Sequence, residues 1–178
     1  MLPAVPEDLA HRLLAASELH GDFVLSSGRR SSVYFDKFRF LTDPPLLRDL
    51  ATAVARLIPE GTTHLAAPEG AATLLVAAVA LEVSLPIAVV RKEPKAYGTR
   101  SQVEGHAPAG AQVALIEDVS TTGRQVLGAA RALEAHGCRV GVILLAIDRG
   151  GGAALREAGY RVRSVVEVTP NRDESVMD

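Results

Sequence analysis

The chain has 178 residues, which favours a single domain, and its formal net charge of −2 lacks the basic surplus typical of proteins that bind nucleic acid. Hydrophobic residues make up 48% of the sequence and aromatic residues only 4%, which favours aliphatic helix-on-sheet packing over an aromatic-rich β-sandwich. The single cysteine, Cys138, excludes a disulfide scaffold and suits a reducing cytoplasm. The longest apolar stretches, such as 71–81, are too short to span a bilayer, so we expect neither nucleic acid nor a membrane as partner.

The first part of the chain predicts a helix, a small pair of strands and a second helix. Pro6-Glu7-Asp8 precedes a helical pattern of leucines, and Gly21 is expected to mark the end of this helix. Residues 23–25 and 33–35 predict two short strands around a polar turn. Asp43-Pro44 then predicts an N-cap and first helical position, with the helix running to about position 58.

From residue 64 onward, short apolar strands alternate with helices. Strands are expected at 64–67, 87–90, 113–116, 140–147 and 162–168, and helices at 70–83, 122–136 and 153–158. Strands that are apolar on both faces and alternate with helices indicate a parallel sheet covered on both sides. The sequence therefore predicts an α/β fold with a mainly parallel central sheet flanked by helices. Residues 171–178 are polar and are expected to be frayed.

One segment interrupts this alternation. About twenty residues between positions 90 and 111 lack apolar periodicity, and such a long loop in a compact domain is usually functional or disordered. Its cations are Arg91, Lys92, Lys95 and Arg100. A mobile cationic loop can close over a polyphosphate and stabilise charge on a leaving group. The alternative is an exposed, solvated loop without a binding role.

The sharpest signal is an apolar strand that ends in two carboxylates and is followed by a hydroxyl-rich turn, Val113-Ala114-Leu115-Ile116-Glu117-Asp118-Val119-Ser120-Thr121-Thr122-Gly123. The free N–H groups, hydroxyls and helix dipole at such a turn form an anion site suited to a phosphate. The carboxylates repel phosphate, but they can accept hydrogen bonds from sugar hydroxyls or help to hold a phosphate-bound Mg²⁺ through its waters. Together these requirements describe a phosphorylated sugar with vicinal hydroxyls. The alternative is an ordinary capped helix with solvated acids, but the carboxyl edge of a parallel sheet favours the binding site.

A third signal lies at the end of the strand predicted over 140–147, in Asp148-Arg149-Gly150-Gly151-Gly152. An arginine at this edge can bind a carboxylate or a planar base. A surface Asp–Arg pair followed by a flexible turn is an equally good interpretation of these residues alone. The histidines show no metal-ligand spacing, and no G-x-S-x-G nucleophile motif occurs.

These motifs resemble those of a known family. Glu117-Asp118-Val119-Ser120-Thr121-Thr122-Gly123 is similar to the motif with which type I phosphoribosyltransferases bind 5-phosphoribosyl 1-diphosphate (PRPP). The combination with Arg91-Lys92-x-x-Lys95-x-x-Gly98 and Gln102-Val103-Glu104-Gly105 resembles the catalytic loop of orotate phosphoribosyltransferases. The N-terminal hood of that family resembles Gly21-Asp22-Phe23-Val24-Leu25-Ser26-Ser27-Gly28-Arg29 with Tyr34-Phe35-Asp36. The resemblance extends from about Leu9 to Val168.

The resemblance implies the type I phosphoribosyltransferase fold in a single domain over 1–178. This domain would comprise an N-terminal helix and hood (1–40), an α/β core (41–168) and a mobile catalytic loop (91–105). The implied reaction transfers the 5-phosphoribosyl group from PRPP to orotate, giving orotidine 5′-monophosphate and diphosphate for pyrimidine nucleotide synthesis. Mg²⁺ would be carried by PRPP rather than by protein ligands. The protein would be a cytoplasmic homodimer in which loop 91–105 reaches the neighbouring active site.

The resemblance also assigns roles to individual residues. It implies that Lys95 and Asp118 are catalytic. It implies PRPP binding by Arg91, Lys92, Lys95, Tyr97, Glu117, Asp118, Val119, Ser120, Thr121, Thr122, Gly123, Arg124 and Gln125. It implies orotate binding by Tyr34, Phe35, Thr121 and Arg149.

Three positions depart from the family pattern. Ser26 stands where many members carry a hood lysine, and Tyr97 stands where the loop usually has a histidine. Glu69 adds a negative charge near the expected diphosphate position. Two alternatives therefore stay open: a phosphoribosyltransferase for another base, and a non-catalytic PRPP sensor. Arg149 tests the first, because orotate carries a carboxylate that adenine and hypoxanthine lack, and diphosphate release tests the second.

Overall fold

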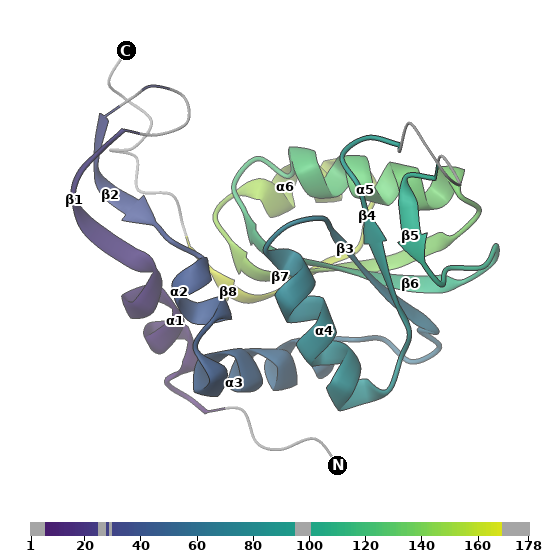
Figure 1. Ribbon diagram of the computed structural model, residues 1–178, viewed down its shortest axis with the longest axis horizontal. Helices are drawn as coiled ribbons and strands as arrows, with labels where there is room; N and C mark the ends of the chain where they lie inside the picture. Colours follow the sequence, from purple (N-terminus) through teal and green to yellow (C-terminus); the bar gives the residue numbers. More distant parts are fainter. Residues whose placement is uncertain (1–5, 25–27, 29, 95–100, 169–178) are drawn as a thin grey trace.

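A six-stranded sheet with helices on both faces forms the body of the protein, and a two-stranded hairpin extends from one end (Figure 1). The computed structural model describes residues 6–24, 28, 30–94 and 101–168. The helices are α1 (Leu9–Ser17), α2 (Phe38–Leu41), α3 (Pro44–Ala55), α4 (Ala72–Val83), α5 (Arg124–Ala135) and α6 (Gly151–Glu157). The strands are β1 (Glu18–Val24), β2 (Arg30–Phe35), β3 (His64–Pro68), β4 (Ile87–Val90), β5 (Val103–Gly105), β6 (Gln112–Ser120), β7 (Arg139–Asp148) and β8 (Val162–Glu167).

The order of strands in the main sheet is β5-β4-β3-β6-β7-β8. Every neighbouring pair runs parallel except β4 and β5, which are antiparallel. The prediction of a mainly parallel sheet is thus confirmed. Because parallel strands are joined by crossover connections, the loops that follow β3, β6 and β7 all emerge at the same edge of the sheet.

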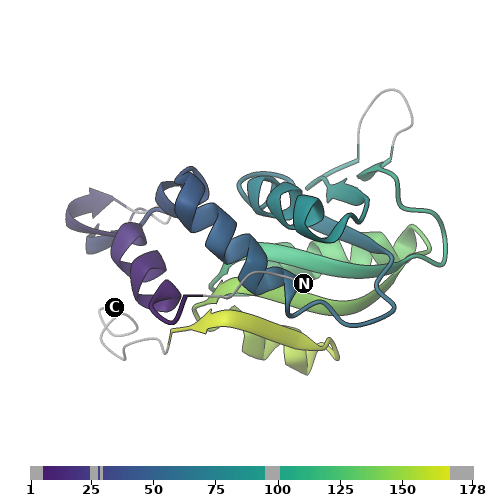
Figure 2. The same cartoon turned by 90° about the horizontal axis from the view of Figure 1, so that it is seen from below.

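Two apolar clusters fill the two faces of this sheet. Helices α3 and α4 pack on one face and α5 and α6 on the other, as Figures 1 and 2 show. Strand β6 contributes to both clusters: Ala114 and Ile116 lie with α3 and α4, and Val113 and Leu115 lie with α5. The alternation follows from the two-residue period of a strand and explains why β6 is apolar on both sides. Within the described ranges, no helix combines the length and apolarity needed to cross a bilayer.

The N-terminal region differs from its prediction in two places. Helix α1 ends at Ser17 rather than near Gly21, because Glu18 adopts an extended conformation and starts β1, which pairs with β2. The Ser17 hydroxyl donates to the carbonyl of Leu13 in the last turn. The short helix α2, which follows β2, was not predicted. The Asp43 cap is confirmed: its carboxylate accepts a hydrogen bond from Leu46 N at 2.9 Å.

Two further differences concern the expected site. The apolar part of β6 was predicted over 113–116, with the two carboxylates at its end; the strand in fact runs to Ser120, two residues beyond Asp118. This end of β6 pairs in register with the end of β7, where Ser120 lies opposite Asp148. The segment predicted as a loop over 91–105 contains a strand, β5, which pairs with β4. Residues 95–100, with Lys95, Tyr97 and Arg100, lie outside the described residues, as do Ser26 and Arg29 of the hood motif and the segment 171–178.

Candidate active site

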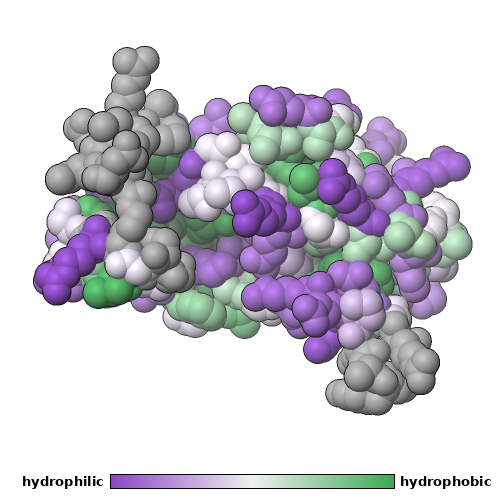
Figure 3. Space-filling view, turned by 90° about the horizontal axis from the view of Figure 1, so that it is seen from above, coloured by the Kyte–Doolittle hydropathy of each residue, from purple (hydrophilic) through white to green (hydrophobic). Residues whose placement is uncertain are grey.

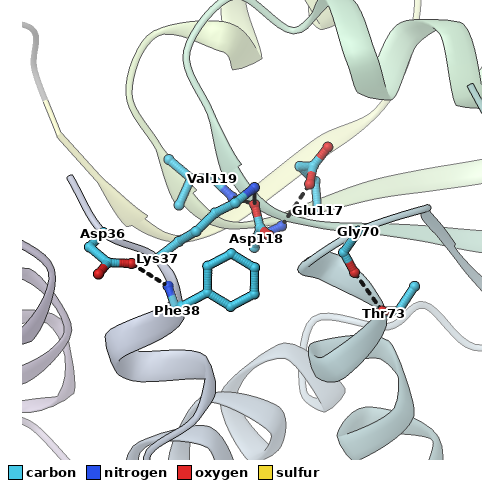
Figure 4. Close-up of polar contacts among 8 residues, drawn as sticks. All are labelled: Asp36, Lys37, Phe38, Gly70, Thr73, Glu117, Asp118 and Val119. Atoms are coloured by element: carbon cyan, nitrogen blue, oxygen red, sulfur yellow. Dashed lines mark hydrogen bonds and ion pairs between the residues drawn. The ribbon is translucent and has the colours of Figure 1, made fainter. Parts of the chain in front are cut away.

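Two adjacent carboxyl groups near the end of β6 form the centre of the site (Figure 4). Asp118 is fully buried and Glu117 is 4% exposed. Asp118 Oδ1 accepts a hydrogen bond from Val119 N at 2.6 Å and lies 3.0 Å from Lys37 Nζ. The backbone N–H of Asp118 donates to Glu117 Oε1 at 3.1 Å. Each carboxyl group is thus held by a specific donor rather than by solvent.

The two carboxyl groups lie on opposite faces of the sheet, because successive side chains on a strand alternate. Asp118 shares its face with Ile116 and the cluster around α3 and α4, while Glu117 shares its face with Leu115 and α5. A ligand that contacts both must therefore lie over the carboxyl end of β6, where the two faces meet. The structure places this point beside the loop that leads into α5.

The environment of Glu117 raises its pKa to about 8. Burial is the largest cause, since it penalises the charged form, and the neighbouring Asp118 acts in the same direction. The Asp118 backbone N–H and Lys37 act in the opposite direction. Glu117 therefore holds a proton at neutral pH, and a neutral carboxyl group can donate as well as accept a hydrogen bond.

The turn after β6 is packed tightly against the start of α6. Gly123 has φ +72°, and a Cβ there would lie 2.7 Å from the carbonyl oxygen of Gly151. A Cβ on Gly151 would in turn collide with Ser120 Oγ. Arg149 N donates to the carbonyl of Ser120 at 2.8 Å. The side chain of Ser120 is buried beneath the turn, so the glycines and Ser120 set the path of the backbone there.

The N-terminus of α5 is arranged to attract an anion. The helix begins at Arg124 and has no acidic residue in its first turn. The positive charge of Arg124 at this end repels the positive end of the helix dipole, unless an anion lies between them. The side chains of Thr121, Thr122, Arg124 and Gln125 are exposed around this end. Free backbone N–H groups at a helix start are suited to a phosphate.

A cleft of about 380 Å³ opens beside this helix end. It is lined by residues from β3, β4, α5 and both sides of the 91–105 segment: Pro68, Val90, Arg91, Lys92, Gln102, Thr122, Arg124, Gln125, Gly128 and Ala129. Three of these residues are cationic. Viewed from above, hydrophilic side chains cover much of this face, and apolar patches interrupt them (Figure 3). The cleft therefore offers positive charge next to the helix N-terminus.

Glu69 is held by the 91–105 segment. Its carboxylate accepts a hydrogen bond from Lys92 N at 2.8 Å and lies 3.8 Å from the Arg91 guanidinium. Gln102 Nε2 donates to the carbonyls of Arg91 and Lys92, at 2.9 and 3.2 Å. The negative charge that Glu69 adds is thus partly offset by Arg91, an arrangement that its sequence position did not reveal.

Phe35 and Arg149, both predicted to bind a base, are brought together from opposite ends of the chain. The Arg149 Cζ lies 4.8 Å from the centroid of the Phe35 ring, a cation–π arrangement. Tyr34 is 43% exposed, and its ring centroid lies 5.5 Å from that of Phe23. The hairpin thus places the ring of Phe35 beside the arginine that follows β7, and the ring of Tyr34 beside Phe23.

Lys37 is the main residue of this site that sequence reasoning missed. It lies 81 positions before Asp118, so no local spacing connects the two. The available signal was its position directly after Tyr34-Phe35-Asp36, a segment already assigned to the site. A lone lysine beside an aromatic segment carries no indication of the carboxylate that it will contact.

Comparison with known proteins agrees with this geometry. The family model described as "Phosphoribosyl transferase domain" matches residues 40–173. The orotate phosphoribosyltransferase of Methanocella arvoryzae is 42% identical over 149 residues, covering 83% of this chain and 85% of the relative. That of Thermococcus gammatolerans is 37% identical over 174 residues, covering 95% and 92%. Among solved structures, orotate phosphoribosyltransferase from Aeropyrum pernix superposes with a TM-score of 0.74 at 37% identity, covering 90% of this chain and 93% of the other.

The matched region includes the whole main sheet, the carboxylate pair and the turn into α5. The chain belongs to the phosphoribosyltransferase family. Within this family it is one of the orotate phosphoribosyltransferases, since its curated relatives match it over most of its length at 37–42% identity. The fold predicted from the resemblance is thereby confirmed.

The raised pKa of Glu117 predicts a pH-dependent loss of stability. The folded protein keeps a proton to about pH 8 that the unfolded chain releases near pH 4.5, so stability falls as the pH rises between these values. Glu117→Gln has no proton to lose. We compare the free energy of unfolding of this variant with that of the natural protein. The difference should shift in favour of the variant between pH 5 and pH 8, by at least about 1.4 kcal/mol, the equivalent of one pKa unit. Urea unfolding at both pH values measures this difference.

Glu157→Gln, on the exposed surface of α6, controls for the loss of one carboxylate from the chain. It should show no comparable gain between the two pH values. A constant difference between Glu117→Gln and the natural protein over this range would mean that Glu117 is already ionised in the folded state.

Proposed function

We propose that this protein transfers the 5-phosphoribosyl group from PRPP to orotate, releasing diphosphate and forming orotidine 5′-monophosphate. The observation that carries the proposal is the buried Glu117–Asp118 pair at the end of β6, directly before a helix N-terminus that lacks acidic residues. A phosphate and a sugar diol are together the ligand that satisfies both features. The curated relatives named above are orotate phosphoribosyltransferases, which supports orotate as the acceptor.

The proposed PRPP site follows the path of the chain from β6 into α5. The backbone of the turn 120–123, with Thr121, Thr122, Arg124 and Gln125, binds the 5-phosphate. Asp118 accepts a hydrogen bond from one ribose hydroxyl. The protonated carboxyl group of Glu117 can donate a hydrogen bond to the second ribose hydroxyl or accept one from it. The diphosphate lies in the cationic cleft, against Arg91 and Lys92. Val119, Ser120 and Gly123 contribute through the backbone, and Lys95 and Tyr97, outside the described residues, are proposed to complete this set.

Orotate is proposed to lie between the hairpin and the end of β7. Arg149 binds its carboxylate by charge-assisted hydrogen bonds, and Phe35 and Tyr34 provide apolar contact with the ring. Thr121 is exposed in the turn between the proposed PRPP and orotate sites, at the same edge of the sheet. Since orotate is an anion at neutral pH, the protein need not supply a strong base for the attack.

The chemistry requires charge stabilisation on both sides of the bond that breaks. As the bond between C1 of the ribose and the diphosphate lengthens, the ribose becomes oxocarbenium-like and negative charge moves onto the leaving group. Arg91 and Lys92 stabilise the leaving group. The carboxylate of Asp118 is held near the ribose, where it favours the positive sugar.

Mg²⁺ is proposed to arrive bound to PRPP. The described residues include no group of three or more His, Cys, Asp or Glu side chains arranged to hold a metal. Mg²⁺ prefers oxygen ligands, keeps several waters and commonly binds through substrate phosphates. When bound, it would neutralise charge on the diphosphate, and Glu117 and Asp118 would help to hold it through its waters.

We also propose a cytoplasmic homodimer in which loop 91–105 of one subunit reaches the active site of the other, in addition to the contacts that Arg91 and Lys92 make in the cleft of their own subunit. Apart from Thr73 and Glu82, helix α4 consists of apolar residues, a composition typical of a buried helix. Yet Leu74 is 40% exposed and Leu81 86% exposed, with exposed Ala77 between them on one face. A second copy of the chain would cover this apolar face.

The first test of the proposed function is orotate consumption, followed by ultraviolet absorbance, with PRPP and Mg²⁺ present and with each omitted. We expect loss of orotate only when both are present. If orotate is not consumed although calorimetry shows that PRPP binds, the chain uses another base or acts as a sensor. Diphosphate release with adenine, hypoxanthine or uracil then separates these two outcomes.

Arg149→Met tests the identity of the base. Loss of a charge-assisted contact with the orotate carboxylate should raise the KM for orotate about tenfold or more. The KM for PRPP should change by less than about threefold, since its proposed contacts lie elsewhere. An unchanged KM for orotate would exclude Arg149 as its carboxylate ligand.

Leu81→Glu tests the dimer through the exposed face of α4. A buried charge at an apolar interface is unfavourable, so sedimentation should show a shift from dimer toward monomer. Arg131→Glu, on the exposed surface of α5 across the sheet, is the control and should leave the assembly unchanged. A dimer of undiminished stability in Leu81→Glu would place the interface on another surface.

A further inference from the structure

Lys37 connects the hairpin side of the molecule with the carboxylate pair of the core. It lies between β2 and α2, and its ammonium reaches across to Asp118, with Nζ 3.0 Å from Oδ1 (Figure 4). The Lys37 side chain is 35% exposed, whereas Asp118 is fully buried. The charge of Asp118 is therefore balanced by a residue from a different part of the fold.

The two oxygens of Asp118 have unequal surroundings. Oδ1 accepts from both Val119 N and Lys37 Nζ. Oδ2 is buried and has no hydrogen-bond partner among the described residues. An unpaired buried carboxylate oxygen is unfavourable, so Oδ2 is the atom that gains most from a ligand hydroxyl. Fixing Oδ1 from one side determines where Oδ2 points.

The local structure of α2 does not account for a lysine at this position. Lys37 stands at the N-cap of α2, where a cation opposes the helix dipole and provides no acceptor for the first N–H groups. The carboxylate of the preceding residue, Asp36, accepts from Phe38 N at 3.0 Å and supplies the acceptor instead. The Lys37 carbonyl accepts from Leu41 N at 3.2 Å within α2, whereas its side chain reaches out of the helix to Asp118.

We propose that Lys37 is a positioning residue for the transfer reaction, which holds the Asp118 carboxylate oriented toward the ribose hydroxyls. The proposal rests on the proposed function, because it names the support of the same ribose site. Lys37 also follows Phe35 by two residues, and Phe35 contacts Arg149. One short segment therefore holds the carboxylate on the ribose side and the aromatic ring on the base side, which aligns the two substrates.

A double-mutant cycle of Lys37→Met and Asp118→Asn tests whether Lys37 acts through Asp118. In the natural background, Lys37→Met should lower kcat/KM for PRPP about tenfold or more, because it leaves a buried carboxylate without its cation. In the Asp118→Asn background, the same substitution should cost less than about threefold, because no charge remains to be held. Equal losses in both backgrounds would overturn the proposal.

Two further variants separate charge from packing. Lys37→Arg keeps the cation and should recover most of the activity that Lys37→Met loses. If only the packing of the aliphatic part of the side chain mattered, restoring the charge would not be needed for this recovery. Arg39→Met removes a cation from the same short helix at an exposed position and should leave kcat/KM unchanged. Full activity of Lys37→Met, or loss of activity in Lys37→Arg equal to that in Lys37→Met, would refute the role. Circular dichroism at the assay temperature identifies variants that have not folded.

The orotate assay on the natural protein separates a failure of this proposal from a failure of the proposed function. If it consumes orotate in the presence of PRPP and Mg²⁺, the cycle is measured in kcat/KM. If it binds PRPP without consuming orotate, the proposed function fails, and the same cycle is measured by calorimetry as PRPP affinity. The non-additivity between Lys37→Met and Asp118→Asn is then expected in the dissociation constants, and additive losses would again overturn the role of Lys37.

Discussion

A carboxylate that is fully removed from water, as Asp118 is, persists in a folded protein only if other groups replace its hydration. Here the replacements are the backbone N–H of Val119 and the ammonium of Lys37. The neighbouring Glu117 avoids a second buried charge by retaining its proton. Much of the arrangement around the end of β6 follows from this requirement, including the position of the segment between the hairpin and α3.

The same edge of the sheet shows how a parallel fold builds a site from distant residues. Strands β6 and β7 end side by side, and the turn after each strand packs on the other. Asp148 Oδ1 accepts from both Gly150 N and Gly152 N at 2.9 Å, so the turn after β7 is fixed by its own strand end. Gly151 then leaves room for Ser120 and Gly123. The conformation of the turn after β6 therefore depends on the turn after β7 as well as on its own sequence.

The sequence predicted those features that depend on local patterns. Strand–helix alternation indicated the parallel sheet, and the Asp43 cap and the start of α5 followed from short motifs. Where the prediction was wrong, pairing with a distant strand decided the outcome: β1 replaced the end of the first helix because β2 was available, and β6 continued to Ser120 because β7 lay beside it. The contacts of Lys37 with Asp118 and of Glu69 with Lys92 join segments whose proximity exists only in the folded chain.

The pairing of Arg91 with Gln102 has a consequence for how this enzyme family can vary. Arg91 N donates to the carbonyl of Gln102 at 2.8 Å, and Gln102 Nε2 donates back to the carbonyl of Arg91. The ten residues between them therefore start and finish at one fixed point at the edge of the sheet. Even a doubling of the length of such a loop changes its closure entropy by only about 0.6 kcal/mol. The length of this stretch can therefore change at little cost in folding free energy, so it is free to vary with the demands of substrate handling.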